Sequence, residues 1–143
     1  MTLNLPSTPP CLAAISIIQK LQNDGFQALL AGGCVRDLLL NRTPHDFDVA
    51  TSAPPHVILH SFPNTVHVGL QFGVVIVVQN GIQTQVATFR SDGSYLDGRH
   101  PSTVHFSDPQ SDALRRDFTI NGLFYDPIAH KLLDFVGGQH DLK

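Results

Sequence analysis

The chain has 143 residues and a formal net charge of −3, from nine Lys and Arg against twelve Asp and Glu. Hydrophobic residues make up 42% of it and charged residues only 15%, proportions that exclude a disordered or polyelectrolyte chain. The length fits one compact domain. The net negative charge indicates that this chain alone does not bind long nucleic acid, because Lys and Arg side chains make the contacts with phosphates.

Compartment and redox state are predicted from features that the sequence lacks. The longest aliphatic run, Val74 to Val78, is far shorter than the ~20 residues of a membrane-spanning helix. The polar, Pro-rich start of the chain has no secretory-signal pattern. Cys11 and Cys34 are isolated thiols, and the eight His form no metal-ligand pattern with a cysteine cluster. We therefore expect a cytoplasmic protein with no membrane partner, no disulfide framework and no zinc site.

The first half of the sequence predicts short strands alternating with helices. Apolar residues at every third position from Leu12 to Leu21 indicate a helix that begins around Pro9 and ends at Asn23. The next expected elements are a strand over Phe26–Ala31, a helix over Cys34–Leu40, a strand over Asp46–Ala50 and a short helix from Pro54–Pro55 to just before Pro63.

The second half predicts a hairpin, a long loop and a final helix and strand. Asn80–Gly81 is a strong two-residue hairpin turn between two runs rich in Val, Ile and Thr. The expected elements are strands over Val66–Val68, Val74–Gln79 and Ile82–Arg90, a mobile loop over Ser91–Gln110, a helix over Asp112–Tyr125 and a strand over Lys131–Phe135. A loop of that length inside one domain is usually functional.

The segment Leu30–Asp37 contains a Gly pair between an expected strand and an expected helix. Gly32 and Gly33 would leave backbone N–H groups at the helix start, which suits a phosphate. Arg36, one turn further, would present its guanidinium fork to phosphate oxygens. An ordinary tight turn followed by a solvated arginine fits the same residues, so this segment alone leaves both interpretations open.

Asp46, Phe47 and Asp48 place two carboxylates at alternate positions of an expected strand. Residues i and i+2 of a strand share a face, so both carboxylates would point to one site while Phe47 enters the core. Hard oxygen ligands of this kind suit Mg²⁺, which binds through a few carboxylates together with substrate phosphates. Because such pairs are also common in turns, the motif is weak when taken alone.

Arg115–Asn121 holds two cations with an Asp and an Asn on the expected last helix. These side chains would suit a triphosphate and a ribose hydroxyl. An amphipathic helix that buries Phe118, Leu123 and Phe124 fits equally well.

The three segments Leu30–Leu39, Asp46–Thr51 and Arg115–Asn121 together resemble the CCA-adding enzyme (tRNA nucleotidyltransferase) and bacterial poly(A) polymerase family. These proteins are class II template-independent nucleotidyltransferases, related in their catalytic core to DNA polymerase beta. Further segments match in the family's order, namely Val86–Arg90, Asp97–Pro101 and Asp134–Gly138. The resemblance runs from about Leu12 to Lys143.

The resemblance implies a fold, a set of site residues and a reaction. The fold would be a DNA polymerase beta-like nucleotidyltransferase head of the α/β (α+β) class, with a small mixed sheet flanked by helices, over residues 1–143. The implied site comprises the catalytic residues Asp46 and Asp48, which would bind two Mg²⁺ ions, and the nucleotide-binding residues Gly32, Gly33, Arg36, Arg116, Asp117 and Asn121. The reaction would be in-line attack of an RNA 3′-hydroxyl on the α-phosphate of CTP or ATP, with release of pyrophosphate.

Two departures from the family pattern affect these expectations. Gln85 occupies the position where family members usually carry a Glu that serves as a third carboxylate at the metal site, so reduced or absent activity is expected. The chain also ends before the neck, body and tail domains, which in the family select the nucleotide and hold the tRNA. We therefore expect a truncated head whose RNA partner, tRNA, binds through those absent domains.

Three functions remain open, and CCA addition is favoured. Val68–Val75 has no basic residue, whereas bacterial poly(A) polymerases typically carry a basic stretch there. A poly(A) polymerase head is the first alternative. The second is a non-catalytic nucleotide-binding module, which is suggested by Gln85.

Overall fold

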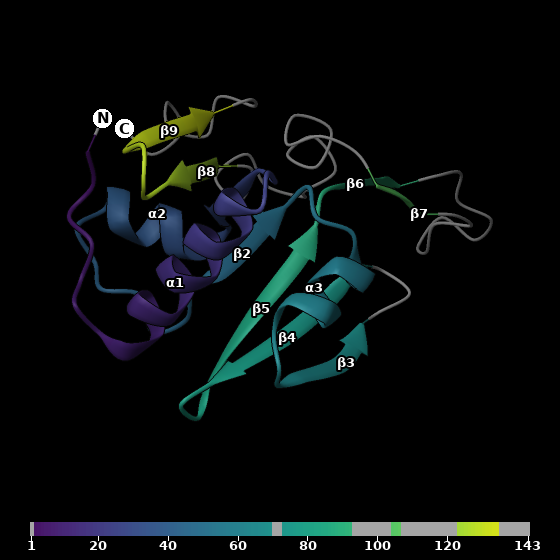
Figure 1. Ribbon diagram of the computed structural model, residues 1–143. Coiled ribbons are helices and arrows are strands. Elements are labelled where there is room, and N and C mark those ends of the chain that lie inside the picture. The colour runs from purple at the N-terminus through teal and green to yellow at the C-terminus, as the bar shows by residue number, and fades with distance from the viewer. Residues whose placement is uncertain (1, 70–72, 93–103, 107–122, 135–143) are drawn as a thin grey trace, which may run out of the picture.

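The computed structural model describes residues 2–69, 73–92, 104–106 and 123–134. Its helices are α1 (Pro9–Asn23), α2 (Gly33–Leu39) and α3 (Pro55–Ser61). Its strands are β1 (Ala28–Ala31), β2 (Asp48–Thr51), β3 (Thr65–Gly69), β4 (Val74–Gln79), β5 (Ile82–Thr88), β6 (Arg90–Asp92), β7 (Val104–Phe106), β8 (Leu123–Asp126) and β9 (Lys131–Asp134) (Figure 1).

Most of the strands form one mixed sheet. Its seven strands run in the order β3-β4-β5-β2-β1-β8-β9, and β6 pairs with β7 in a separate two-stranded sheet. The β2–β5 pair is parallel, and the other described pairs are antiparallel. The mixed sheet and the α/β class expected from the resemblance are therefore confirmed.

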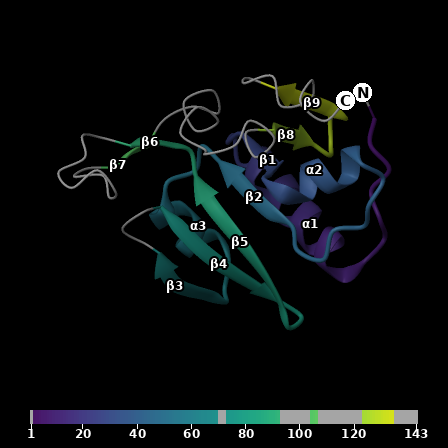
Figure 2. The same ribbon diagram turned by 180° about the vertical axis from the view of Figure 1, so that it is seen from behind.

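The two faces of the large sheet differ in what covers them. The larger hydrophobic core joins buried residues of all three helices to one face, where β1, β2 and β8 contribute Leu30, Val49 and Tyr125. A smaller cluster lies on the opposite face and is built from Leu29, Ala31, Ala50, Phe89 and Phe124. Figure 2 shows this second face, with β4 and β5 in front of α3. The described helices thus leave one face of the sheet for other groups.

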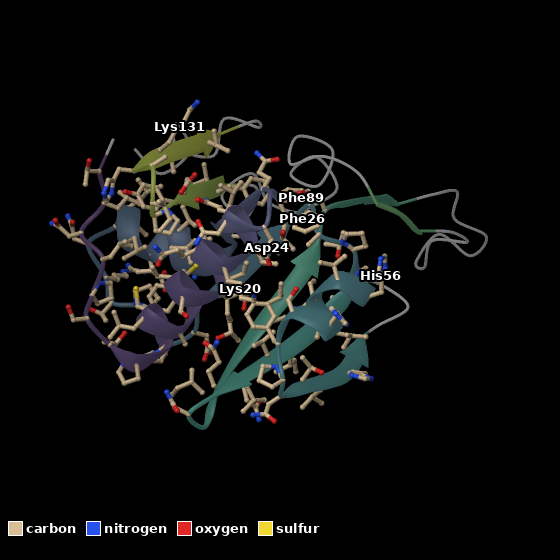
Figure 3. The ribbon with its side chains drawn as sticks, viewed as in Figure 1. Lys20, Asp24, Phe26, His56, Phe89 and Lys131 are labelled. Atoms are coloured by element: carbon tan, nitrogen blue, oxygen red, sulfur yellow. The ribbon has the colours of Figure 1, made fainter. Side chains whose placement is uncertain are left out.

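Aromatic packing closes the smaller cluster. The rings of Phe89 and Phe124 meet edge to face, with centroids 5.9 Å apart and an interplanar angle of 77°. Both side chains are fully buried. Because Phe89, labelled in Figure 3, follows β5 directly, its contact with Phe124 connects the end of β5 to β8.

The N-terminal elements agree closely with the sequence-based expectations. α1 begins at Pro9, as expected. The first N–H groups of a helix have no partner within the helix, so the missing N–H of proline costs nothing at this position. The buried side chains of α1 include Ile18 and Leu21.

The Asn80–Gly81 turn is also confirmed, since both residues have positive φ, 53° and 79°, as the turn type requires.

The helix expected over Asp112–Tyr125 is wrong at its C-terminal end. Leu123, Phe124 and Tyr125 lie in β8, which pairs with β1 on one side and β9 on the other. All three side chains are buried. An inner strand that is covered on both faces therefore has a continuous apolar run in its sequence. Periodicity cannot distinguish such a run from a buried helical turn. The rest of that expected helix lies outside the described residues.

The loop expected over Ser91–Gln110 is also partly wrong. Ser91 and Asp92 continue β6, which pairs with His105 and Val104 of β7. The expected strand over Ile82–Arg90 is accordingly divided between β5 and β6. The loop's remaining residues lie outside the described part of the chain.

Among the described helices, none combines the length and the apolar character that a membrane crossing requires.

Candidate functional site

The carboxylates of Asp46 and Asp48 flank the start of β2. Asp48 is the first residue of β2 and Asp46 lies two residues before it. Both are exposed, whereas Phe47 between them is only 3% exposed and belongs to the larger core. Val49, the next residue, also belongs to the larger core, so Asp48 lies on the opposite face of β2, which the described helices do not cover, and Asp46 lies just before that strand.

The strand register brings Gln85 to the same place. β2 and β5 run parallel with Val49 opposite Val86 and Ala50 opposite Ala87. Continuing this register by one residue sets Asp48 beside Gln85, and both residues are exposed. Side chains opposite one another in a ladder share a face of the sheet. The amide of Gln85 is therefore the neighbour that β5 offers to the Asp48 carboxylate.

The Gly32–Gly33 turn begins where β1 ends, next to the start of β2. Ala31, the last residue of β1, pairs with Asp48 and also with Phe124 of β8. Gly32 then has φ 79° and ψ −144°, a conformation that is essentially restricted to glycine. The positive φ turns the chain from β1 into α2 within one residue, so the Gly pair stays beside the carboxylates.

Arg36 folds back over this turn. A Cβ added to Gly33 would lie 3.2 Å from Nη2 of Arg36 and 3.7 Å from its Cζ, so the guanidinium rests against the Gly33 backbone. Its Nε donates to Oδ1 of Asp37 at 3.2 Å. A side chain at position 33 would therefore require this guanidinium to shift by a few tenths of an ångström.

Cys34 of α2 is buried and contacts the last residue of β1 and the backbone of Asp48 at the start of β2. Its thiol donates to the carbonyl oxygen of Ala31 at 3.2 Å. Burial raises the pKa of the Cys34 thiol to about 12; a hydrogen bond with the Asp48 backbone opposes the shift, and the Asp48 charge adds to it. Burial also raises the pKa of Cys11, in α1. Cys11 and Cys34 are both buried free thiols in this structure.

We expect both thiols to be silent toward a disulfide reagent in the native chain at pH 8, and both to react after denaturation. Thiolate is the reactive form, and burial disfavours it. Unfolded Cys34 would ionise near 9.0, whereas the folded thiol stays protonated to about 12. The protonated Cys34 thiol therefore makes its full contribution to the free energy of unfolding below pH 9, and this contribution falls as the pH rises toward 12. Colorimetric thiol titration with and without guanidinium checks this, and fast labelling of the native chain would contradict it.

Part of the expected site lies outside the described residues. This applies to Arg116, Asp117 and Asn121. The described strand β8 begins at Leu123, two positions after Asn121 along the chain, and it pairs with β1 next to the Gly32–Gly33 turn. Of the expected site residues, the structure therefore brings together Gly32, Gly33, Arg36, Asp46 and Asp48 around the ends of β1 and β2.

Sequence reasoning missed two features. Asp37 was not singled out, although its place next to Arg36 was a visible signal. His56, labelled in Figure 3, and His60 stand four residues apart on α3, and both are exposed, a spacing that the sequence-based interpretation overlooked. Within the described ranges, no three His, Cys, Asp or Glu side chains form a group that could hold a metal ion.

Comparison with known proteins gives the site a family context. The family model for the poly(A) polymerase head domain matches residues 28–143. A CCA-adding enzyme of Geobacillus sp. (strain WCH70) is 47% identical over 131 residues, which cover 91% of this chain and 32% of that protein. One from Oceanobacillus iheyensis is 44% identical over 135 residues, which cover 94% of this chain and 34% of that protein.

Solved structures agree with the sequence comparisons. The CCA-adding enzyme of Bacillus stearothermophilus in complex with CTP superimposes with a TM-score of 0.82 and 38% identity, covering 94% of this chain and 32% of that one. A tRNA nucleotidyltransferase complexed with a primer tRNA and an incoming ATP analogue gives a TM-score of 0.66 at 26% identity, covering 88% of this chain and 36% of that one.

These matches establish the class of the protein. The chain belongs to the poly(A) polymerase head domain family. It spans about a third of the length of the curated relatives it matches, 32% and 34% for the two described above.

Proposed function

We propose that this chain is the catalytic head of a template-independent RNA nucleotidyltransferase that acts in tRNA CCA addition. It would transfer CMP or AMP from CTP or ATP to an RNA 3′-hydroxyl, forming a phosphodiester bond and releasing pyrophosphate. The observation that carries this proposal is the convergence of Asp46, Asp48 and the Gly32–Gly33 turn with Arg36 at the adjoining ends of β1 and β2.

The side chains at this place fit a magnesium ion that shares its coordination with a nucleotide. Asp48 at the start of β2 and Asp46 just before it offer exposed carboxylate oxygens, and Gln85 offers an amide oxygen next to Asp48. Mg²⁺ prefers hard oxygen donors and commonly takes only one or two protein carboxylates in addition to substrate phosphates. When bound, the ion would neutralise phosphate charge and lower the pKa of the attacking hydroxyl.

The other residues would position the triphosphate. Gly33 begins α2 and is half-buried, and the Arg36 guanidinium beside it presents donors in a fork that matches phosphate oxygens. Arg116, Asp117 and Asn121 are proposed to complete nucleotide binding. No covalent intermediate is required, so orientation and charge neutralisation would supply most of the rate enhancement.

Among RNA substrates, tRNA is supported by the relatives. The two curated relatives described above are named CCA-adding enzymes, and one structural neighbour was solved with a primer tRNA. A poly(A) polymerase head remains the alternative within the same family. Nucleotide choice and tRNA binding are proposed to reside in the neck, body and tail domains that the family resemblance implies.

A second candidate function is supported by one residue. Gln85 places a neutral amide beside Asp48, where a third carboxylate would give the ion a stronger ligand. A chain with this substitution fits a module that binds nucleotide with little or no transfer. A catalytic head and a non-catalytic module would both bind nucleotide, and only the catalytic head would transfer it to RNA at an appreciable rate.

Titration calorimetry with CTP and with ATP tests the proposal. We expect Mg²⁺-dependent binding of both nucleotides with affinities within about threefold of each other, a difference below 1 kcal/mol. We expect excess chelator to abolish this binding, because the Mg²⁺ ion would be held jointly by the carboxylates and the nucleotide phosphates. Absence of binding by a chain shown to be folded by circular dichroism would contradict the proposal. Incorporation of labelled CMP into a tRNA that lacks its 3′ end would then separate transfer from binding alone.

A further inference from the structure

We propose that Asp37 is a positioning residue that holds the Arg36 guanidinium over the Gly33 backbone, ready for an incoming triphosphate. The inference rests on the proposed function, because it assigns the orientation of Arg36 in that same site. It starts from a pair of neighbouring residues on α2, in which Nε of Arg36 donates to Oδ1 of Asp37 at 3.2 Å.

The position of the guanidinium is defined from two sides. Nε contacts Asp37, while the opposite end of the group lies against Gly33, where an added Cβ would be 3.2 Å from Nη2 and 4.0 Å from Nη1. A guanidinium binds phosphate most specifically through two parallel N–H bonds. With Nε engaged by Asp37, the pair of Nη groups at the turn is the edge that suits such a fork.

The contact between Asp37 and Arg36 would preorganise the arginine side chain for nucleotide binding. An arginine side chain carries about 2 kcal/mol of rotamer entropy, much of which an unrestrained Arg36 would lose on binding nucleotide. The ion pair restrains the side chain before the nucleotide arrives, which lowers that cost. The Arg36 and Asp37 side chains are 36% and 25% exposed, so the pair is partly screened and its effect is modest.

The sign of the effect separates positioning from simple electrostatics. The Asp37 carboxylate adds negative charge next to a site proposed to bind a triphosphate. If charge alone mattered, its removal would tighten nucleotide binding. If Asp37 positions Arg36, its removal weakens binding despite the relieved repulsion. The two explanations predict opposite changes in the same dissociation constant.

A matched control exists elsewhere in the chain. Lys20 and Asp24 form an ion pair of 3.3 Å at the C-terminal end of α1, and Figure 3 shows their side chains close together. They are 46% and 41% exposed and lie outside the proposed site. Asp24→Ala changes the net charge as Asp37→Ala does, without touching Arg36.

The experiment measures Mg²⁺-CTP binding by titration calorimetry for the parent chain, Asp37→Ala, Asp37→Asn and Asp24→Ala. We expect Asp37→Ala to weaken binding about threefold to fivefold, the range of a partly exposed ion pair. Asp37→Asn keeps a neutral acceptor and should fall between Asp37→Ala and the parent. Asp24→Ala should bind as the parent does. Melting temperatures within about 2 °C would show that the fold is intact.

Two further readouts test whether Asp37 acts through Arg36. In an Arg36→Ala background, Asp37→Ala should produce no further weakening, which is the signature of coupled residues in a double-mutant cycle. The ¹⁵N–¹H resonance of Arg36 Nε, assigned with Arg36→Lys, should shift in Asp37→Ala and stay unchanged in Asp24→Ala. This resonance reports the contact without any nucleotide.

Each outcome decides between the two proposals. Parent-like or tighter binding by Asp37→Ala, an equal loss in the Arg36→Ala background, or an unmoved Nε resonance would overturn the positioning role alone. Failure of the folded parent and Asp24→Ala chains to bind nucleotide would overturn the proposed function, and the positioning role with it.

Discussion

Replacing Asp46 and Asp48 together by Asn is expected to weaken Mg²⁺-dependent nucleotide binding strongly while leaving the fold unchanged. Both carboxylates are exposed, and their backbone flanks the buried Phe47 side chain, so isosteric amides should disturb neither the core nor the sheet. Loss of two charged ligands removes the strongest donors that the described residues offer to a hard cation. We expect affinity for Mg²⁺-CTP to fall at least about tenfold, or 1.4 kcal/mol.

The single variants refine this result. Asp48→Asn should be the more damaging, since Asp48 lies within β2 and beside Gln85, whereas Asp46 precedes the strand. Where the chain shows nucleotide transfer, loss of either carboxylate should reduce the rate by roughly 10²-fold or more, as expected for removing electrostatic stabilisation of the reacting phosphate. Asp24→Asn is the control for net charge. Wild-type binding by the double variant would show that the carboxylates are not the metal ligands.

Gln85→Glu is expected to raise affinity for Mg²⁺ and to increase or create nucleotide transfer. The continued β2–β5 register sets position 85 beside Asp48, on the face that carries the proposed site. A carboxylate there would add a third charged ligand to the proposed site, and ion affinity rises with the number of charged ligands. We expect roughly tenfold tighter Mg²⁺ binding in the presence of CTP. Equal binding and equal transfer rates for the variant and the parent would contradict this.

Gln83→Glu is the matched control for that substitution. Gln83 lies two residues earlier on β5, is exposed as Gln85 is, and pairs with Val78 near the hairpin. It introduces the same charge at a position farther along the strand from Asp48. An increase seen for Gln85→Glu and absent for Gln83→Glu would tie the effect to the metal site. A similar increase for both would point to the net charge of the strand instead.

Local patterns were enough to predict most of the elements. The stripe from Leu12 to Leu21 gave the α1 boundaries closely, because helix caps, prolines and apolar spacing act within a few residues of one another. The burial of Phe47 between two exposed carboxylates followed from strand alternation alone. Near-neighbour physics also explains the Asn80–Gly81 hairpin.

Elements whose identity depends on distant partners were the ones predicted wrongly. Leu123–Tyr125 is a strand because β1 and β9 supply hydrogen bonds on both sides, and neither partner is visible in the local pattern. The β6–β7 pairing likewise joins segments on either side of a long intervening stretch. Composition rich in Gly, Pro and Ser predicted a loop there, since propensity carries no information about pairing.

The sequence by itself determined the order of helices and strands, the segments that carry the family resemblance, and the residue types that could hold a metal and a triphosphate. Only the tertiary structure decided which of these lie together. The parallel β2–β5 register puts Gln85 beside Asp48, and the φ of Gly32 turns α2 so that Arg36 lies over Gly33 against Asp37. The reason is physical: propensity and periodicity are local properties of a chain, whereas strand register and side-chain contacts arise from burial between distant segments.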